Sequence, residues 1–250
     1  MARYDFASHR LFVDYPLAAG TDAPVTREQA NYLLNVLRMA EGAKLLVFNG
    51  RDGEWRAELR QPNRRTAVLH LIEQTRPQTP PAGLRHAFAP LKAARLDYLV
   101  QKAVEMGAGR LAPVITQRTQ VSRLKAERLA ANAIEAAEQC GILALPEIEP
   151  ETRLPAFLAG LAAEELLVFA DEDAEVADPL ALLTAAPAAE RITLLIGPEG
   201  GFTAEERAAI LKHPRLCRLS LGPRILRADT AAVAALALVQ AVRGDWRSAG

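Results

Sequence analysis

The chain has 250 residues and a mass of 27.1 kDa, and 50% of its residues are hydrophobic, so it can bury a large core without disulfides or a structural metal. A charged content of 24% and a mean hydropathy of +0.02 exclude a disordered chain and a membrane protein. The formal net charge is zero, and the longest apolar run, residues 231–239, is far shorter than the roughly 18 residues of a membrane span. The first residues do not show a basic segment followed by an apolar stretch, so we expect no signal peptide and a cytoplasmic protein.

Metal-dependent and thiol-dependent reactions are poor candidates for this sequence. Cys140 and Cys217 have no C-x-x-C partner and no histidine at ligand spacing, and the four histidines are scattered singly. Two buried free thiols are the favoured interpretation, and a disulfide between the two cysteines stays open. We expect no metal ion.

Charge is distributed unevenly along the chain. Residues 147–190 carry 1 Lys or Arg against 11 Asp or Glu, so the rest of the chain carries 29 against 19. A protein with this distribution can present a basic face to a nucleic acid and an acidic patch elsewhere. The alternative is that these charges are simply solvated.

The first 75 residues are predicted to form a small β-barrel. Thr26 and Gln29 make a capping box that begins a helix extending through Leu37. Two glycines in residues 49–53 suit a hairpin connection. Short strands with tight turns are typical of small barrels, which often hold oligonucleotides, although a fold alone proves no function. The strands are predicted at residues 44–48, 54–59 and 67–72.

A proline-rich stretch separates this part from the rest of the chain. Three prolines in residues 75–81, without helical or strand periodicity, indicate a stiff linker, which we place at residues 76–82. In residues 83–250 strands alternate with helices, which predicts a second domain of the α/β class with a mainly parallel sheet. Its strands are predicted at residues 84–88, 111–115, 166–169, 192–196 and 216–221, and its helices at residues 94–106, 124–140, 203–211 and 229–243.

Two glycine-proline loops each follow an apolar strand of this second domain. Residues 197–201 follow one strand and residues 222–227 follow the next. Ligands of open α/β sheets bind beyond the carboxyl ends of the strands, where loops of small residues expose their backbone. Neither loop has the G-x-G-x-x-G or the P-loop pattern, so phosphate binding is disfavoured. Ordinary strand-to-helix turns are the alternative.

A helix start follows each of these loops. Thr203 and Glu206 form a second capping box, and Asp229 is placed to cap the last helix, so a purely structural role for Asp229 stays open beside a catalytic one. The last helix is apolar on every side, which predicts burial in the core or against a second subunit.

The two loops also carry a resemblance to a known family. Residues 196–202 and 221–227, the latter running into Asp229, resemble the RsmE family of 16S rRNA uridine-N3 methyltransferases in the SPOUT superfamily. The match covers most of the chain, and the paired loops are its most specific part. Weaker matches to the family's motifs are residues 36–39 with Gly42, residues 101–107, and residues 138–141 with Pro146.

The resemblance implies a PUA-like RNA-binding β-barrel followed by a SPOUT methyltransferase domain with a deep trefoil knot, in a homodimer that acts on 16S rRNA or the small ribosomal subunit. It also implies that S-adenosyl-L-methionine binds among the knot loops, including the segment after strand 166–169. The implied cofactor-binding residues are Phe169, Ile196, Gly197, Pro198, Glu199, Gly200, Gly201, Leu221, Gly222, Pro223, Ile225 and Leu226.

Methylation at uracil N3 requires removal of a proton, because the protonated nitrogen is a poor nucleophile. Arg224 and Arg227 are permanent cations that could polarise a uracil carbonyl or grip a phosphate, and Asp229 could accept the proton. Glu199 could offset the charge of the sulfonium. These three catalytic candidates and Glu199 are hypotheses, and structural ion pairs are the alternative for the arginines.

RNA binding would depend on arginines that contact phosphates, and Trp55 is the candidate for base stacking. Asp229 stands where the family usually has glutamate, Ile142 where arginine is common, and Gln117 where glutamate is frequent. A drifted RNA-binding protein without activity and a small-molecule methyltransferase are therefore the alternatives. The basic residues expected to contact RNA are Arg38, Arg51, Arg56, Arg64, Arg65, Arg118, Arg123 and Lys125.

Overall fold

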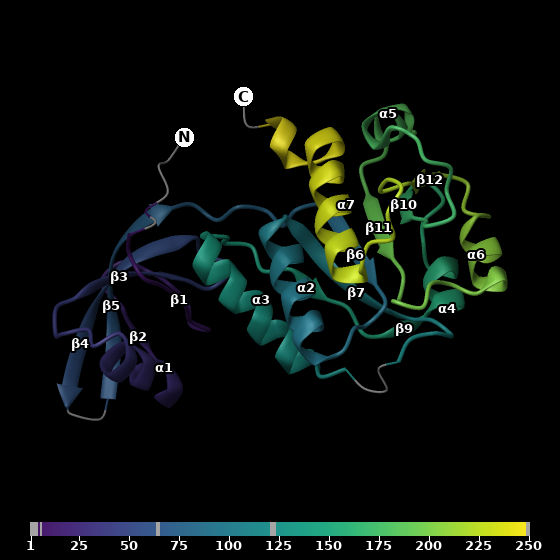
Figure 1. Ribbon diagram of the computed structural model, residues 1–250. Helices are drawn as coiled ribbons and strands as arrows, with labels where there is room; N and C mark the ends of the chain where they lie inside the picture. Colours follow the sequence, from purple (N-terminus) through teal and green to yellow (C-terminus); the bar gives the residue numbers. More distant parts are fainter. Residues whose placement is uncertain (1–4, 6, 64–65, 121–123, 249–250) are drawn as a thin grey trace. The chain divides into compact units, whose positions relative to one another are not determined.

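The computed structural model describes residues 5, 7–63, 66–120 and 124–248, and the chain divides into two compact units (Figure 1). One unit comprises Met1–Pro80 with Ala137–Leu145, and the other comprises Pro81–Ala136 with Pro146–Gly250. In the described part of the chain, no helix combines the length and the apolar character needed to cross a membrane. The assignment of residues 1–75, 76–82 and 83–250 as barrel, linker and methyltransferase domain stays a prediction.

The N-terminal unit is built on a five-stranded sheet in the order β1-β3-β4-β5-β2. Strands β3, β4 and β5 pair antiparallel, as two hairpins do, and β1 runs parallel to β3. All three strands predicted for this part are confirmed, whereas β1 and β2, of three residues each, are too short to show an alternating pattern. The strands are β1 (Arg10–Phe12), β2 (Asp22–Pro24), β3 (Lys44–Phe48), β4 (Glu54–Asn63) and β5 (Thr66–Arg76).

The predicted N-terminal helix is two kinds of helix in succession. Thr26 caps α1 (Arg27–Asn31) through the expected capping box with Gln29, and a π-helix, Tyr32–Val36, continues it. Arg38 then leaves the helix with a φ of 53°, in the left-handed region. Apolar residues of this helix pack on the inward-facing residues of the sheet. The core cluster of this unit includes Ala30, Leu33, Leu45, Val47, Ala57, Leu59, Leu69 and Leu71.

A buried ionic cluster attaches residues 137–145 to this sheet. Glu54 accepts from Arg10 Nε and Arg76 Nη2, each at 2.7 Å, and Arg76 also donates to the carbonyl of Gly141 at 2.9 Å. Glu138 Oε1 accepts from the backbone N–H of Phe12 at 2.8 Å. Burial raises the pKa of Glu54, but the hydrogen bonds from Arg76, Arg10 and Thr75 outweigh burial and hold it below the usual value. The Glu-Gln-Cys-Gly motif therefore has a structural role in the N-terminal unit.

The second unit contains a parallel sheet in the order β12-β10-β11-β6-β7-β8, with β9 pairing with β7. Every strand pair in it is parallel, which confirms the α/β class. The trefoil knot stays a prediction. The strands are β6 (Leu84–Phe88), β7 (Ala108–Ile115), β8 (Glu147–Ile148), β9 (Thr152–Arg153), β10 (Leu166–Ala170), β11 (Ile192–Ile196) and β12 (Leu216–Leu219).

Helices cover both faces of this sheet: α2 and α7 lie on one face, and α4 and α6 on the other (Figure 1). The long helices α2, α3 and α7 and the shorter α6 were predicted; α4 and α5, of six and seven residues, were not. The helices are α2 (Ala93–Glu105), α3 (Ala126–Cys140), α4 (Leu154–Ala159), α5 (Pro179–Ala185), α6 (Ala204–Ile210), α7 (Ala228–Arg243) and the 3₁₀ helix Asp245–Ser248.

The structure confirms one predicted helix cap and corrects another. Thr203 and Glu206 form the expected capping box at the start of α6. Helix α7 begins at Ala228 with Arg227 as its N-cap residue, so the prediction that Asp229 caps α7 is wrong. Asp229 lies in the first turn instead, where its Oδ1 accepts from the N–H of Thr230 at 2.8 Å.

Neither Cys140 nor Cys217 is in a disulfide. Cys217 is buried, as expected, and burial raises its pKa, but Cys140 is exposed, so the prediction of burial is wrong for Cys140. Within the described residues, no cluster of three or more His, Cys, Asp or Glu side chains could hold a metal ion.

Unfolding should depend on pH through His86, which is fully buried in β6 beside Phe88. Burial lowers the pKa of His86 from 6.5 to about 4. Between these two pH values the unfolded chain binds a proton that the folded chain excludes, so the free energy of unfolding should fall as the pH drops, by on the order of 3 kcal/mol in total. Urea unfolding at pH 7, 6 and 5 measures this, and the same pH slope in His86→Leu would contradict the assignment.

Candidate active site

Three loops of the second unit meet at one edge of its sheet. Strand β10 lies between β12 and β11, and all three strands run in the same direction, so their carboxyl ends share an edge. The loops that follow them line a single cavity of about 470 Å³. This volume lies within the range of small-molecule sites, and the position is the usual one for a ligand of an open α/β sheet.

Most of the site residues expected from the sequence line this cavity. Gly200 and Asp229 do not belong to the described lining. The side chain of Ile225 is 90% exposed, so it stands at the mouth of the cavity. The predicted residues that the structure brings together are Phe169, Ile196, Gly197, Pro198, Glu199, Gly201, Leu221, Gly222, Pro223, Arg224, Ile225, Leu226 and Arg227.

Glycine is required at two positions of the loop after β11. A Cβ on Gly197 would lie 2.6 Å from the ring of Phe202. Gly201 has a φ of +68°, and a Cβ there would collide with the carboxylate of Glu172. Glycine at these positions therefore lets Phe202 and Glu172 pack directly against the backbone of the loop, and any side chain there would strain it.

Side chains from other elements hold this glycine-rich loop in place. Arg118, on the loop after β7, donates to the carbonyl of Gly200 at 2.6 Å. Glu206 accepts from the N–H of Gln117 at 2.7 Å and from the N–H of Thr203 at 3.0 Å, so the capping carboxylate also joins the two loops. Arg95 on α2 forms an ion pair with Glu199. Arg118, which was expected to contact RNA, thus has a contact inside the site.

The loop after β10 is organised around the buried carboxylate of Asp171. Arg207 on α6 donates to it through Nε at 3.0 Å and Nη2 at 2.9 Å, and Arg218 on β12 donates through Nε at 2.8 Å. Burial raises the pKa of Asp171, but these two arginines outweigh burial and hold it below the usual value. Asp171 therefore stays ionised and connects β10 to α6 and β12 at the base of the cavity.

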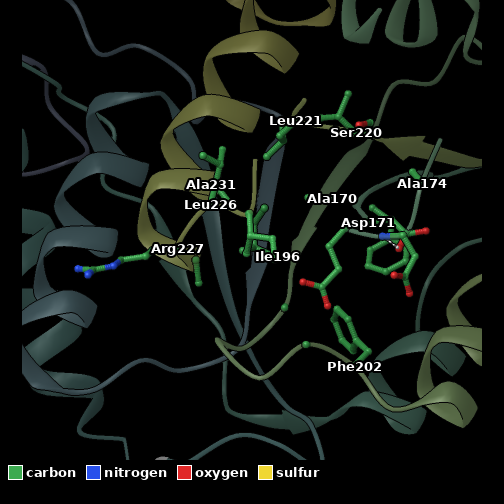
Figure 2. Close-up of a pocket in the computed structure, with 18 of the residues that line it drawn as sticks. Ala170, Asp171, Ala174, Ile196, Phe202, Ser220, Leu221, Leu226, Arg227 and Ala231 are labelled. Carbon is green, nitrogen blue, oxygen red and sulfur yellow. Dashed lines mark hydrogen bonds between the residues drawn. The ribbon is translucent and has the colours of Figure 1, made fainter. Parts of the chain in front are cut away.

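Two of the described arginines at the cavity are not part of its ion pairs. Within the described residues, Arg224 and Arg227 have no ion pair, and both are exposed. Figure 2 shows the guanidinium of Arg227 directed away from the side chains of Ile196, Leu226 and Phe202. The two arginines thus stand at the border of the cavity, where a larger molecule has access to them.

Several lining residues were missed by the sequence analysis. Arg95 and Arg207 come from helices, and Asp171 and Glu172 follow β10, where the resemblance implied a cofactor segment but only Phe169 was named. An acidic run after an apolar strand was the available signal for the two carboxylates. Nothing in the local sequence marked the two arginines.

The arginines expected to bind RNA in the N-terminal unit differ in their surroundings. In the N-terminal unit, Arg38 is exposed, Arg51 pairs with Asp14 at 3.1 Å, and Arg56 pairs with Glu73. The indole N–H of Trp55 donates to the carbonyl of Asp52, and its ring packs against the core, so only part of it is available for stacking. Three expected contacts lie outside the described residues: Arg64, Arg65 and Arg123.

Comparison with known proteins decides the family. The RNA methyltransferase domain family matches residues 78–240, and the RNA methyltransferase PUA domain family matches residues 25–72. Ribosomal RNA small subunit methyltransferase E of Synechocystis is 32% identical over 241 residues, which cover 94% of this chain and 78% of that protein. The chain belongs to the ribosomal RNA small subunit methyltransferase E family. The resemblance inferred from the paired loops is therefore confirmed.

A further relative and two solved structures agree with the assignment. The Rickettsia conorii enzyme is 29% identical over 233 residues, covering 93% of this chain and 95% of that protein. The Neisseria gonorrhoeae methyltransferase E, solved bound to S-adenosyl methionine, is 26% identical with a TM-score of 0.81 and covers 96% of this chain and 99% of that one. The methyltransferase Lpg2936 of Legionella pneumophila, in complex with the same cofactor, is 28% identical with a TM-score of 0.80, covering 95% of this chain and 99% of that one.

Removal of the Asp171 carboxylate should destabilise the second unit. Its side chain is 2% exposed, and Asp171→Asn leaves Arg207 and Arg218, 27% and 39% exposed, without their shared anion. Breaking a fully buried pair costs about 3–5 kcal/mol, and partial exposure of the arginines reduces the expected loss to about 2 kcal/mol. Urea unfolding measures it. Asp173→Asn, at a side chain that is 69% exposed, is the control and should change stability little.

Proposed function

We propose that this chain transfers a methyl group from S-adenosyl-L-methionine to N3 of a uridine in 16S ribosomal RNA. The observation that carries the proposal is the convergence of three loops, two of them rich in glycine, on one cavity in a chain of the methyltransferase E family. The solved relatives of Neisseria and Legionella that hold the cofactor cover almost the whole chain.

The residues around the cavity fit this cofactor. The cavity has the volume of a small-molecule site, apolar side chains such as Ile196 and Leu226 line it, and a Cβ at Gly197 or Gly201 would collide with the lining side chains of Phe202 or Glu172. The bound cofactor would supply an electrophilic methyl group on a positively charged sulfur. The residues proposed to hold it are Phe169, Ile196, Gly197, Pro198, Glu199, Gly200, Gly201, Leu221, Gly222, Pro223, Ile225 and Leu226.

Glu199 supports the glycine-rich loop after β11 and is not available to balance the charge of the sulfonium. Its carboxylate is already paired with Arg95, so its charge is compensated within the protein. We therefore assign Glu199 to the support of the glycine-rich loop, through which its backbone would line the cofactor.

The proposed catalytic residues are Arg224, Arg227 and Asp229, which lie on the loop after β12 and on the first turn of α7. Two exposed guanidinium groups can stabilise negative charge on the uracil carbonyl oxygens as the N3 proton leaves. Asp229 is partly exposed and is the proposed proton acceptor, directly or through water. Since Asp229 is outside the cavity lining, the proton would leave on the side of the target base, away from the cofactor.

Binding of the RNA would use arginines in both units. The proposed contacts are Arg38, Arg51, Arg56, Arg118 and Arg123; the ion pairs of Arg51 and Arg56 are exposed and could be exchanged for phosphate contacts. Since phosphate contacts displace counterions, the affinity for RNA should fall steeply as salt rises.

A homodimer is the proposed assembly, and the cytoplasm is the proposed location. Helix α7 buries one face against its own unit, while Val233, Ala234, Ala237 and Leu238 stay partly exposed. A second subunit that covers these apolar residues would complete the burial that the composition of α7 predicts.

The direct test of the function is a transfer assay. Small ribosomal subunits that lack the modification are mixed with the protein and labelled S-adenosyl-L-methionine, and the modified base is mapped. We expect label at N3 of one uridine of the 16S rRNA. Transfer to a different base, or no transfer to either free rRNA or subunits, would overturn the proposal.

Substitution of the proposed catalytic residues should slow transfer with little effect on cofactor binding. Removal of an electrostatic or proton-transfer group costs about 10²–10³-fold in rate, so Arg224→Ala and Asp229→Asn should each lower kcat by roughly that factor. Single-turnover transfer and calorimetric titration of the cofactor measure the two effects. Lys212→Ala removes an exposed cation at the end of α6 and is the control. Near-normal kcat in both site variants would contradict these roles.

A further inference from the structure

Four carboxylates line the cavity, and three of them already have a cationic partner. Asp171 is held by Arg207 and Arg218, Glu199 pairs with Arg95, and Asp173 lies 3.5 Å from Arg207. Glu172 forms no ion pair with any residue that the structure describes. Among the described lining residues it is the carboxylate that has no ion pair.

The carboxylate of Glu172 lies against the glycine-rich loop. Its Oε1 occupies the space that a Cβ on Gly201 would need, so this glycine lets the carboxylate approach the backbone of the loop. Arg118 Nη1 lies 3.9 Å from the same point, but this nitrogen donates to the carbonyl of Gly200. Glu172 therefore belongs to the wall formed jointly by the loops after β10 and β11.

The backbone on both sides of Glu172 is fixed. The N–H of Asp171 donates to the carbonyl of Leu219 at 3.1 Å, and the N–H of Ala174 donates to the carbonyl of Asp171 at 3.1 Å. The N–H of Asp173 donates to Asp171 Oδ1 at 3.2 Å, and Arg218 donates to the carbonyl of Asp173 at 3.2 Å. The backbone at Glu172 is thus ordered before a ligand arrives, which reduces the backbone entropy lost on binding.

We infer that Glu172 is the carboxylate that recognises the positive charge of the methyl donor. This inference rests on the proposed function and extends it to a residue that selects the ligand by charge. S-adenosylmethionine carries a sulfonium and an ammonium against one carboxylate, so its net charge is positive. Glu172 is exposed at the cavity wall and has no ion pair among the described residues, so its carboxylate favours a positively charged ligand over a neutral one.

The test is calorimetric titration of the full chain, in wild-type form and as Glu172→Gln. The ligands are S-adenosylmethionine and 5′-methylthioadenosine, a neutral thioether that retains the adenosine. We expect Glu172→Gln to raise the Kd for S-adenosylmethionine about 10-fold and to leave the Kd for methylthioadenosine within twofold, because only the first ligand loses an ionic partner. Glu175→Gln is the matched control, since Glu175 is exposed on the same loop and is outside the cavity lining.

S-adenosylhomocysteine, which keeps the ammonium but has no sulfonium, separates the two cations of the donor. A 10-fold loss for this ligand in Glu172→Gln supports recognition of the ammonium, and a loss confined to S-adenosylmethionine supports recognition of the sulfonium. An unchanged Kd for S-adenosylmethionine, or an equal loss for methylthioadenosine, would overturn the inference. If the wild-type protein bound none of the three compounds, the proposed function itself would fail, and this assignment with it.

Discussion

The parallel pairing of β10 with both β11 and β12 is the constraint on which the site depends. Parallel strands end at the same edge of a sheet, so three chain segments that are separated by helices in the sequence leave the sheet together. Residues 166–170 and 192–196 form nearly continuous buried runs, and this burial fixes the register of the strands. Any slip in this register would move one wall of the cavity relative to the other two.

Loops made of glycine and proline have few side chains with which to pack, so their shape must be imposed by neighbouring elements. Here the neighbours are polar: Arg118 holds Gly200, Glu206 joins two loops, and Arg95 holds Glu199. In the loop after β10, Asp171 accepts hydrogen bonds from Arg207 and Arg218 and so fixes this loop to α6 and β12. The protein thus combines an accessible backbone, suited to ligand binding, with an ionic frame that keeps this backbone ordered.

Sequence patterns identified the parts of the fold whose signals are local. The strand at residues 192–196 has the predicted bounds because its run of mostly apolar residues is flanked by Arg191 and Gly197, and the strand at residues 84–88 has them between Gly83 and Ala89-Pro90. Helices α4 and α5 are too short to show a period, and the π-helix after α1 has the same composition as an α-helix. The partners Arg95 and Glu199 are 104 positions apart, so their pairing depends on the tertiary fold and leaves no mark in the sequence. The N-cap of α7 was also missed, because Asp229 has the favoured residue type but the cap, Arg227, lies two residues earlier.

The assignment of residues 137–145 to the N-terminal unit has a consequence for how the protein is made. Arg10 and Arg76 find further acceptors in the backbone carbonyls of Glu138 and Gly141, which are translated only after β6, α2 and β7 of the second unit. During synthesis the buried ionic cluster of the first sheet therefore stays incomplete until the end of α3 has been translated. Although all five strands of its sheet lie in the first 80 residues, this unit is completed only after part of the second unit has been translated.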